Sequence, residues 1–226
     1  MLQQPPSPCA EAVPRGTLAG VVIAACGALA VFAMAHHPSV ETHTAAETIR
    51  EIGRIGATNR IVHGAMIAIV AALLFGFAVY SVRRGVAKEA VLGAFIAHAI
   101  GTAAMIVAAT VSGFLVSDIA ARYATASPNN LQFAVQVIAI CGEIIQLFGR
   151  LGVIGMSLAV VLWSIDLVRL TGVARAAGIL GFVAGAFALA MLVFGGHLTP
   201  QTLGAIVLGQ AIWYCAIGAL LVRRTL

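Results

Sequence analysis

Six stretches of this chain are too long and too apolar to fold as anything but membrane-spanning helices. A helix needs about 20 mostly apolar residues to cross about 30 Å of hydrocarbon. Only helices and closed barrels satisfy their backbone hydrogen bonds inside lipid, and these runs are far longer than barrel strands. The sequence therefore predicts an all-α integral membrane protein, a six-transmembrane helical bundle. Its spans are expected at 17–35, 61–82, 90–117, 148–168, 176–195 and 201–222.

The composition agrees with a chain that lies mostly in lipid. Hydrophobic residues make up 61% of it and charged residues only 9%, whereas soluble domains are about one-quarter charged. The net charge of +5 comes without any block of like charges, which argues against nucleic acid as a partner. We expect a single membrane domain over residues 17–226, preceded by a disordered, Pro-rich N-terminal tail over residues 1–16.

The basic residues predict how the bundle is oriented. Loops on the cytoplasmic side of a membrane carry an excess of Lys and Arg. With six spans, Arg15, Arg83, Arg84, Lys88, Arg169, Arg175, Arg223 and Arg224 share the side of the two chain ends. Fewer bases, partly balanced by acids, lie on the other side. We therefore expect a plasma-membrane protein of the bacterial inner membrane with both termini in the cytoplasm. Seven spans, with separate crossings at 131–148 and 152–168, are a less favoured alternative.

Three of the predicted helices are longer than the membrane is thick. Residues 44–82 and 131–168 run without proline, and the third helix can continue past its span to Arg122. Their extra turns carry apolar residues on one side and polar residues on the other. Helices 2, 3 and 4 are therefore expected to project as a small external helical cap, with extensions lying flat on the membrane as the alternative.

A stripe of polar residues on the fourth long helix is the best functional clue. Gln132, Gln136, Glu143, Gln146 and Arg150 recur at helical spacing on one face of an otherwise apolar segment. Asn59 and His63 share the inward face of the second helix, so we predict a ligand site at the external interface from Asn59, His63, Glu143, Gln146 and Arg150. The guanidinium of Arg150 would suit an anionic or amphiphilic molecule. The stripe would equally suit a wet surface helix or structural hydrogen bonds between helices.

Several histidines fall on the same side of the membrane. Imidazole binds Zn, Cu, Ni or haem iron, so His36, His37, His63 and His197 are candidate metal ligands, with haem as another cofactor of this chemistry. None of them stands in an H-x-x-x-H or H-E-x-x-H pattern, so their ligands would have to come from separate helices.

Two further polar residues, His98 and Gln210, lie deep inside predicted spans. The simplest expectation is an intramembrane polar pair, in which a His98–Gln210 hydrogen bond satisfies both groups. A proton relay or a haem ligand at His98 is the alternative. Rows of small residues, Gly93, Ala97 and Gly101 on one helix and Gly178, Gly181, Gly185 and Ala188 on another, predict close helix packing within the bundle or, as an alternative, a homodimer seam.

These features leave three functional hypotheses. The first is a membrane binding protein or accessory subunit with a ligand or a membrane-protein partner at the external polar site. The second is a metal- or haem-dependent oxidoreductase that uses the external histidines. The third is a small proton-coupled transporter that uses Glu143, Arg150 and His98. An enzyme is the least supported class, because the sequence contains no recognisable nucleophile motif and no Gly-rich phosphate loop.

Overall fold

The computed structural model describes residues 16–38, 44–194 and 196–226. Every regular element in these ranges is a helix. Six helices are long and apolar enough to cross a membrane, which confirms the predicted all-α, six-span membrane bundle. The predicted disordered tail lies, except for Gly16, outside the described residues, as does the predicted cytoplasmic Arg15.

The helix boundaries follow the predicted spans and extend several of them. The spanning helices are α1 (Thr17–Ala35), α3 (Gly56–Arg84), α4 (Glu89–Thr110), α6 (Pro128–Leu167), α7 (Gly172–Phe194) and α8 (Pro200–Val222). α4 continues through a short π-helix, η1 (Val111–Leu115), into α5 (Val116–Tyr123). α6 is one uninterrupted helix of 40 residues, so the seven-span alternative is wrong.

The predicted continuous helix over 44–82 is broken. A separate helix, α2 (Ala45–Arg54), precedes α3, and the chain turns at Ile55. α2 begins at a capping box, in which the Thr44 side chain accepts from the Glu47 amide and the Glu47 carboxylate accepts from the Thr44 amide. The turn lets Ile49 of α2 pack on α5 and α6, which a straight helix would not allow.

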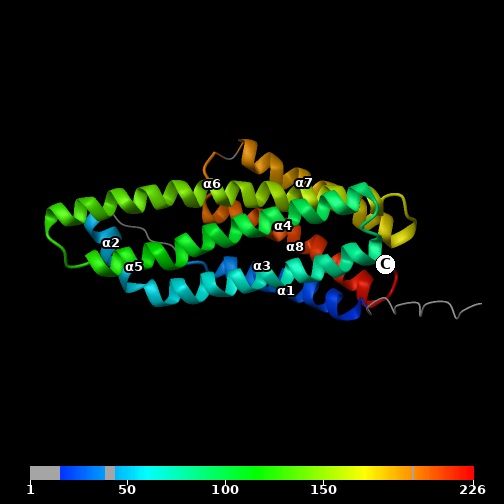
Figure 1. Cartoon of the computed structure of the whole chain (residues 1–226), viewed down its shortest axis with the longest axis horizontal. Coiled ribbons are helices and arrows are strands. Elements are labelled where there is room, and N and C mark those ends of the chain that lie inside the picture. The colour runs from blue at the N-terminus through cyan, green and yellow to red at the C-terminus, as the bar shows by residue number, and fades with distance from the viewer. Residues whose placement is uncertain (1–15, 39–43, 195) are drawn as a thin grey trace, which may run out of the picture.

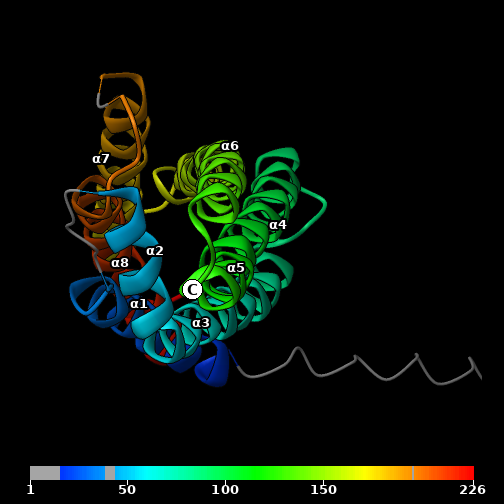
Figure 2. The same cartoon turned by 90° about the vertical axis from the view of Figure 1, so that its left-hand side faces the viewer.

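The six spanning helices form a closed ring. Each packs against two neighbours, in the order α3, α4, α6, α7, α8, α1 and back to α3 (Figure 2). We call the end where α1 begins and α8 ends the terminal end, and the opposite end the cap end. α2, α5 and the start of α6 extend the bundle at the cap end, beyond the α7–α8 loop (Figure 1). They share a small core of Ile49, Ala120 and Ala134.

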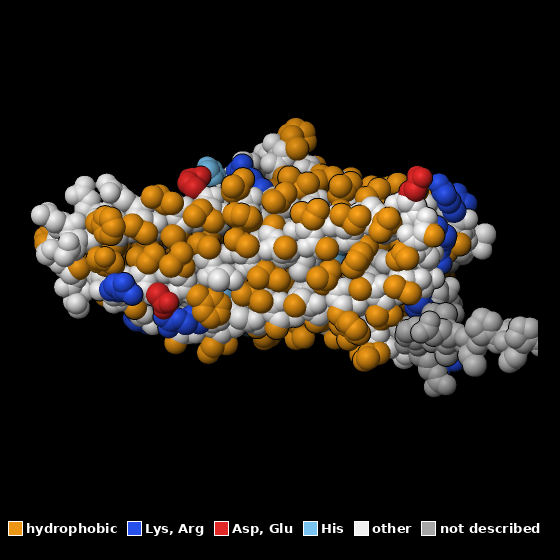
Figure 3. All heavy atoms as spheres, viewed as in Figure 1, with side chains coloured by type: hydrophobic (Ala, Val, Ile, Leu, Met, Phe, Trp, Pro, Cys, Tyr) orange, Lys and Arg blue, Asp and Glu red, His pale blue; other side chains and the backbone are white. Residues whose placement is uncertain are grey.

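The surface has the pattern that a membrane requires. On the face in Figure 3, hydrophobic side chains cover the middle of the molecule and charged side chains lie on either side of this band. At the terminal end, Arg84 and Lys88 donate to the buried carboxylate of Asp166, at 2.7 and 2.9 Å. At the cap end, Arg60 of α3 pairs with Asp118 of α5.

Aromatic side chains fill the interior of the bundle in its terminal half. Phe77 stacks on Trp163 and on Trp213, with ring centroids 4.6 and 5.7 Å apart. The indole nitrogens donate to the hydroxyl of Ser81 and the carbonyl of Ala177, both at 3.1 Å, so both buried polar groups are satisfied. This half of the bundle is therefore a packed core.

Glycines allow the backbones to touch where the helices pack most closely. A Cβ on Gly20 of α1 would lie 2.6 Å from the carbonyl oxygen of Gly218 of α8, and one on Gly101 of α4 would lie 2.7 Å from the backbone nitrogen of Met156 of α6. Small residues serve this purpose in membranes, where water exclusion does not drive helices together. The structure thus places the predicted small residue Gly101 at an intramolecular contact.

Candidate functional site

A cavity opens inside the ring at the level of the α7–α8 loop, and we call it the chamber. It has a volume of about 150 Å³. Five helices, the π-helix and the α7–α8 loop contribute to its wall. The lining residues are Met34, His37, His63, Met66, Met105, Ala108, Ala109, Ser112, Ile145, Gln146, Gly149, Leu198, Thr199, Pro200 and Leu203.

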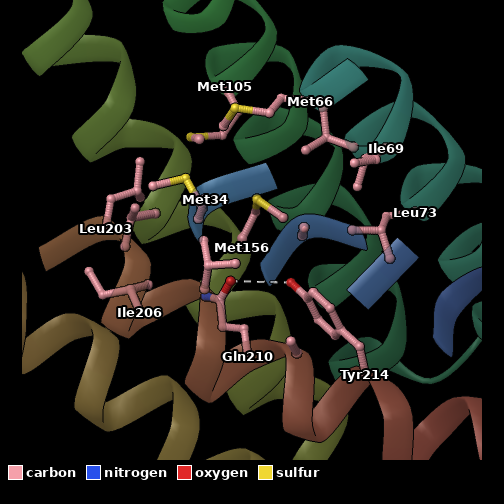
Figure 4. A pocket seen from close by; sticks show the side chains of 15 residues that line it. Met34, Met66, Ile69, Leu73, Met105, Met156, Leu203, Ile206, Gln210 and Tyr214 are labelled. Carbon is pink, nitrogen blue, oxygen red and sulfur yellow. Dashed lines mark hydrogen bonds between the residues drawn. The ribbon is translucent and has the colours of Figure 1, made fainter. Parts of the chain in front are cut away.

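A narrower cavity of about 60 Å³, the well, continues from the chamber toward the terminal end. The two share Met34, Met66, Met105 and Leu203. Figure 4 shows four methionines and several aliphatic side chains around the well, with Gln210 and Tyr214 at one end of it. The Tyr214 hydroxyl donates to Gln210 Oε1 at 3.3 Å, and Gln210 Nε2 donates to Ser157 Oγ at 3.0 Å. The polar groups at this end therefore bond to one another.

A third hollow, the groove, lies between α1 and α8 and has a volume of about 360 Å³. Its lining residues are Val31, Met34, Ala35, His37, Pro200, Gln201, Gly204 and Leu208. The chamber shares Met34, His37 and Pro200 with it, so the two spaces adjoin at these residues. A Cβ built on Gly204 would meet no described atom within 4 Å. The groove is thus open beside Gly204.

The groove exists because α1 and α8 diverge along their length. They touch backbone to backbone at Gly20 and Gly218, near the terminal end. At Gly27 the nearest atom of α8 is 3.2 Å from a built Cβ, and at Gly204, near the other end of the pair, nothing lies within 4 Å. Contact between the two helices therefore fades toward the cap end, where the space opens beside the chamber.

His63 is held rigidly in the chamber wall. Its Nδ1–H donates to the carbonyl of Asn59, one turn earlier, at 2.9 Å, and the residue is 3% exposed. The amide of Asn59 donates to the Ser112 carbonyl and to Ser117 Oγ, both at 3.0 Å. Both acceptors lie in or just after the π-helix. Single π-helical turns occur often at functional sites.

His37 faces His63 from the segment that follows α1. Their ring centroids lie 5.0 Å apart with the planes at 72°. Burial lowers the pKa of His37 below its ordinary value of 6.5, which favours the uncharged imidazole. The chamber therefore presents two neighbouring imidazoles.

The predicted polar stripe on α6 does not converge on a single site. Gln146 lines the chamber, and its amide bonds both to the amide and to the carbonyl of Leu198, each at 2.9 Å. Arg150 donates to the carbonyl of Gly196 at 2.8 Å. Glu143 is exposed, as are Gln132 and Gln136. Of the five predicted ligand-binding residues, His63 and Gln146 line the chamber, Asn59 supports His63, and Arg150 supports the α7–α8 loop.

The four histidines predicted as metal ligands do not come together. His36 is exposed and bonds to the Phe32 carbonyl of its own helix, and His197 is exposed in the α7–α8 loop. Among the described residues, no three His, Cys, Asp or Glu side chains are placed to hold a metal ion. Of the four predicted ligands, the structure brings together His37 and His63, which both line the chamber.

The predicted His98–Gln210 hydrogen bond is also wrong. Gln210 bonds to Ser157 and Tyr214 instead. His98 is completely buried against Phe77 and Trp163, and neither of its ring nitrogens has a hydrogen-bond partner among the described residues. Residue depth along two helices, on which the prediction relied, does not fix which faces of those helices meet.

Four methionines of the cavity were missed by the sequence analysis. Met34, Met66, Met105 and Met156 come from α1, α3, α4 and α6, one each. They are four of the six methionines of the chain. Hydropathy counts each simply as apolar, and no spacing relates residues on different helices. Only the arrangement of the helices brings them together.

The fold and these cavities define a multi-pass α-helical membrane protein with a blind, methionine-lined cavity inside its bundle. Comparisons with protein families, with curated proteins and with solved structures give no match for this chain.

Proposed function

We propose that this protein binds a small amphiphilic molecule of the membrane, whose head group enters the chamber while its apolar part remains in the groove. The observation that supports this most directly is the arrangement of the two spaces. The chamber and the groove meet at Met34, His37 and Pro200, so a molecule held partly in each would pass between α1 and α8.

The chemistry of the chamber favours a neutral, hydrogen-bonding head group. His37, His63, Ser112 and Thr199 line it, and no carboxylate, ammonium or guanidinium is among its described lining residues. A hydroxyl or carbonyl group can bond to such partners without the cost of burying an unpaired charge. Arg150, which suggested an anionic ligand, bonds to the α7–α8 loop instead.

The sizes of the three spaces also favour a head group in the chamber and an apolar chain in the groove. A cavity of about 150 Å³ is large enough for a molecule the size of benzene, and the chamber has this volume. The well adds about 60 Å³ and the groove about 360 Å³. A long apolar chain therefore has room in the groove and the surrounding lipid, whereas the chamber suits the head.

We place this site at the external face of the plasma membrane, in a protein with both termini in the cytoplasm. The surplus of basic residues at the terminal end supports this orientation. The aromatic core in the terminal half supports binding rather than transport, because Phe77, Trp163 and Trp213 fill the path beyond the well.

Photolabelling of the intact protein in nanodiscs would test the proposal. The probe is a long-chain alcohol that carries a diazirine next to its hydroxyl group, and the labelled peptides are identified by mass spectrometry. We expect labels on Met34, His37 and the first turns of α8, and competition by the unmodified alcohol. Labels spread evenly over the lipid-facing surface would contradict the proposal.

Gly204 provides a variant that closes the groove without disturbing the fold. Because a side chain there meets open space, Gly204→Phe should leave the melting temperature unchanged and lower the labelling several-fold. The matched control is Gly142→Phe on α6, where a built Cβ also meets nothing within 4 Å but which lines neither space. Equal labelling of the two variants would contradict access between α1 and α8.

A further inference from the structure

Two imidazole rings and three thioethers meet in the chamber. The His37 and His63 ring centroids are 5.0 Å apart, and Met34, Met66 and Met105 line the same space. An imidazole nitrogen holds a metal ion at about 2.0 Å, so two rings that bind the same ion must be close neighbours. The two histidines meet this condition although they come from different segments of the chain.

His63 has one nitrogen available for a ligand. A carbonyl can only accept, so the bond from Nδ1 to the Asn59 carbonyl fixes the proton on Nδ1 and leaves the lone pair on Nε2. Metal-binding histidines almost always donate their other ring N–H in this way. Nε2 makes no hydrogen bond to any described residue, and His63 is only 3% exposed.

His37 also has an unused nitrogen. Its Nδ1 is buried and has no hydrogen-bond partner within the described part of the chain. A buried polar atom without a partner is rare in folded proteins and calls for a water, an ion or a ligand. The ring that carries this nitrogen has its centroid 5.0 Å from that of His63.

Contacts from the π-helix and from Asn59 hold His63 in place. Gly113 of the π-helix lies directly against the ring, since a built Cβ would be 2.3 Å from His63 Cβ and 2.7 Å from its Cγ. Asn59 then ties α3 to the π-helix through Ser112 and Ser117. The π-helix, the glycine and the asparagine together hold one imidazole in one orientation.

The thioethers complete the ligand set. Met66 follows His63 by three residues, so both side chains lie on the same face of α3. Met34 precedes His37 by three residues and also lines the chamber. Met105 rests on Gly152 of α6, because a built Cβ at Gly152 would lie 2.5 Å from its Sδ. Three helices thus each contribute a thioether to the cavity that the two imidazoles line.

Neutral nitrogen and thioether sulfur select a soft cation. Ca²⁺ and Mg²⁺ take oxygen ligands, mostly carboxylates, whereas thioethers favour Cu(I). A single positive charge is also cheaper to bury than two where no described lining residue carries a compensating charge. We propose that the chamber binds one Cu(I) ion through His37, His63 and Met66, with Met34 and Met105 supplying further sulfur. This site goes beyond the proposed function and does not rest on it, and a bound Cu(I) ion would exclude the head group from the same two imidazoles.

The test uses the full chain, purified in detergent without oxygen and titrated with Cu(I) in competition with bicinchoninate. We expect one ion per chain, and a copper X-ray absorption spectrum with both nitrogen and sulfur neighbours. Met66→Leu conserves volume and should fold, and it should weaken Cu(I) binding about tenfold. His63→Gln should weaken it by tenfold or more, on the order of the loss seen even for residues that only support metal ligands.

The control is Met191→Leu, which removes a methionine that packs outside the chamber and should leave the affinity unchanged. If His63→Gln does not assemble, the double variant Met66→Leu/Met105→Leu tests the proposal instead. Absence of bound Cu(I), equal binding by the double methionine variant, a spectrum without sulfur, or Zn²⁺ binding as tight as Cu(I) would each overturn the proposal. None of these outcomes bears on photolabelling through the groove, so the two proposals fail separately.

Discussion

At the scale of single residues, His98 is the least explained side chain of the bundle. It is completely buried between Phe77 and Trp163, with ring centroids 4.9 and 5.4 Å away. Both of its nitrogens lack partners among the described residues, as does the hydroxyl of Thr102. Leaving a buried polar group unsatisfied costs about 1–3 kcal/mol.

This cost predicts that His98→Leu raises the stability of the bundle. The change removes the unpaired nitrogens and fills a similar volume, so the melting temperature in detergent should stay the same or rise. Differential scanning fluorimetry of the purified protein measures it. A fall of several degrees would contradict the prediction and would mean that a bound group satisfies the histidine in the native protein.

Gln146 is a polar residue that holds the α7–α8 loop in place. Its side chain makes two hydrogen bonds of 2.9 Å to the backbone of Leu198 and so fixes the α7–α8 loop over the chamber. Gln146→Ala removes both bonds, each worth about 1 kcal/mol net. The two bonds together are worth about 2 kcal/mol, so we expect amide hydrogen exchange at residues 196–199 to accelerate up to about 30-fold. Gln136→Ala, an exposed residue of the same helix, is the control and should leave exchange in the loop unchanged.

At the scale of helices, the π-helix between α4 and α5 is the element that shapes the site. Its Gly113 touches the His63 side chain, so an added methyl group would have to displace His63 or separate α3 from η1. Gly113→Ala should therefore destabilise the protein by about 1–3 kcal/mol, the usual cost of overpacking. Thermal unfolding in detergent is the measurement.

The matched control for Gly113→Ala is Gly142→Ala, a glycine inside α6 with open space around its Cβ position. Alanine stabilises a helix interior by up to about 1 kcal/mol relative to glycine, so this variant should melt at the same or a higher temperature. Equal melting of the two variants would show that the contact between Gly113 and His63 is loose.

Hydropathy predicted the helices well and their interruptions poorly. α1 occupies the predicted 17–35, because its run of apolar residues has charged or polar neighbours at both ends. The turn at Ile55 was not predicted, since no proline marks it. It accompanies a tertiary contact of Ile49 with Ala120 and Ala134, which the sequence does not reveal. The π-helix was missed for the same reason, because the bonds that accompany it come from Asn59, 53 residues away from Ser112.

At the scale of the whole molecule, part of the site could be anticipated and part could not. Asn59 and His63 were expected to face inward because helical periodicity puts them opposite the charged residues of the same segment, and both are buried. Periodicity within one helix says nothing about the angle at which another helix arrives. The partners of Gln146, Arg150 and Gln210, and the gathering of methionines from four helices, follow from the order of helices in the ring.

The orientation of the ring in the membrane is the last prediction. α1 begins and α8 ends at the terminal end, where most of the basic residues of the loops fall, and a positive surplus stays in the cytoplasm. In a variant without native cysteines, we place single cysteines at Gln132, exposed at the cap end, and at Arg223, exposed at the terminal end. A membrane-impermeant maleimide added to intact cells should label Gln132→Cys only, and both positions after permeabilisation. Labelling of Arg223→Cys in intact cells would show that the bundle has the opposite orientation. The chamber, with any copper that it binds, and the groove would then lie on the cytoplasmic side.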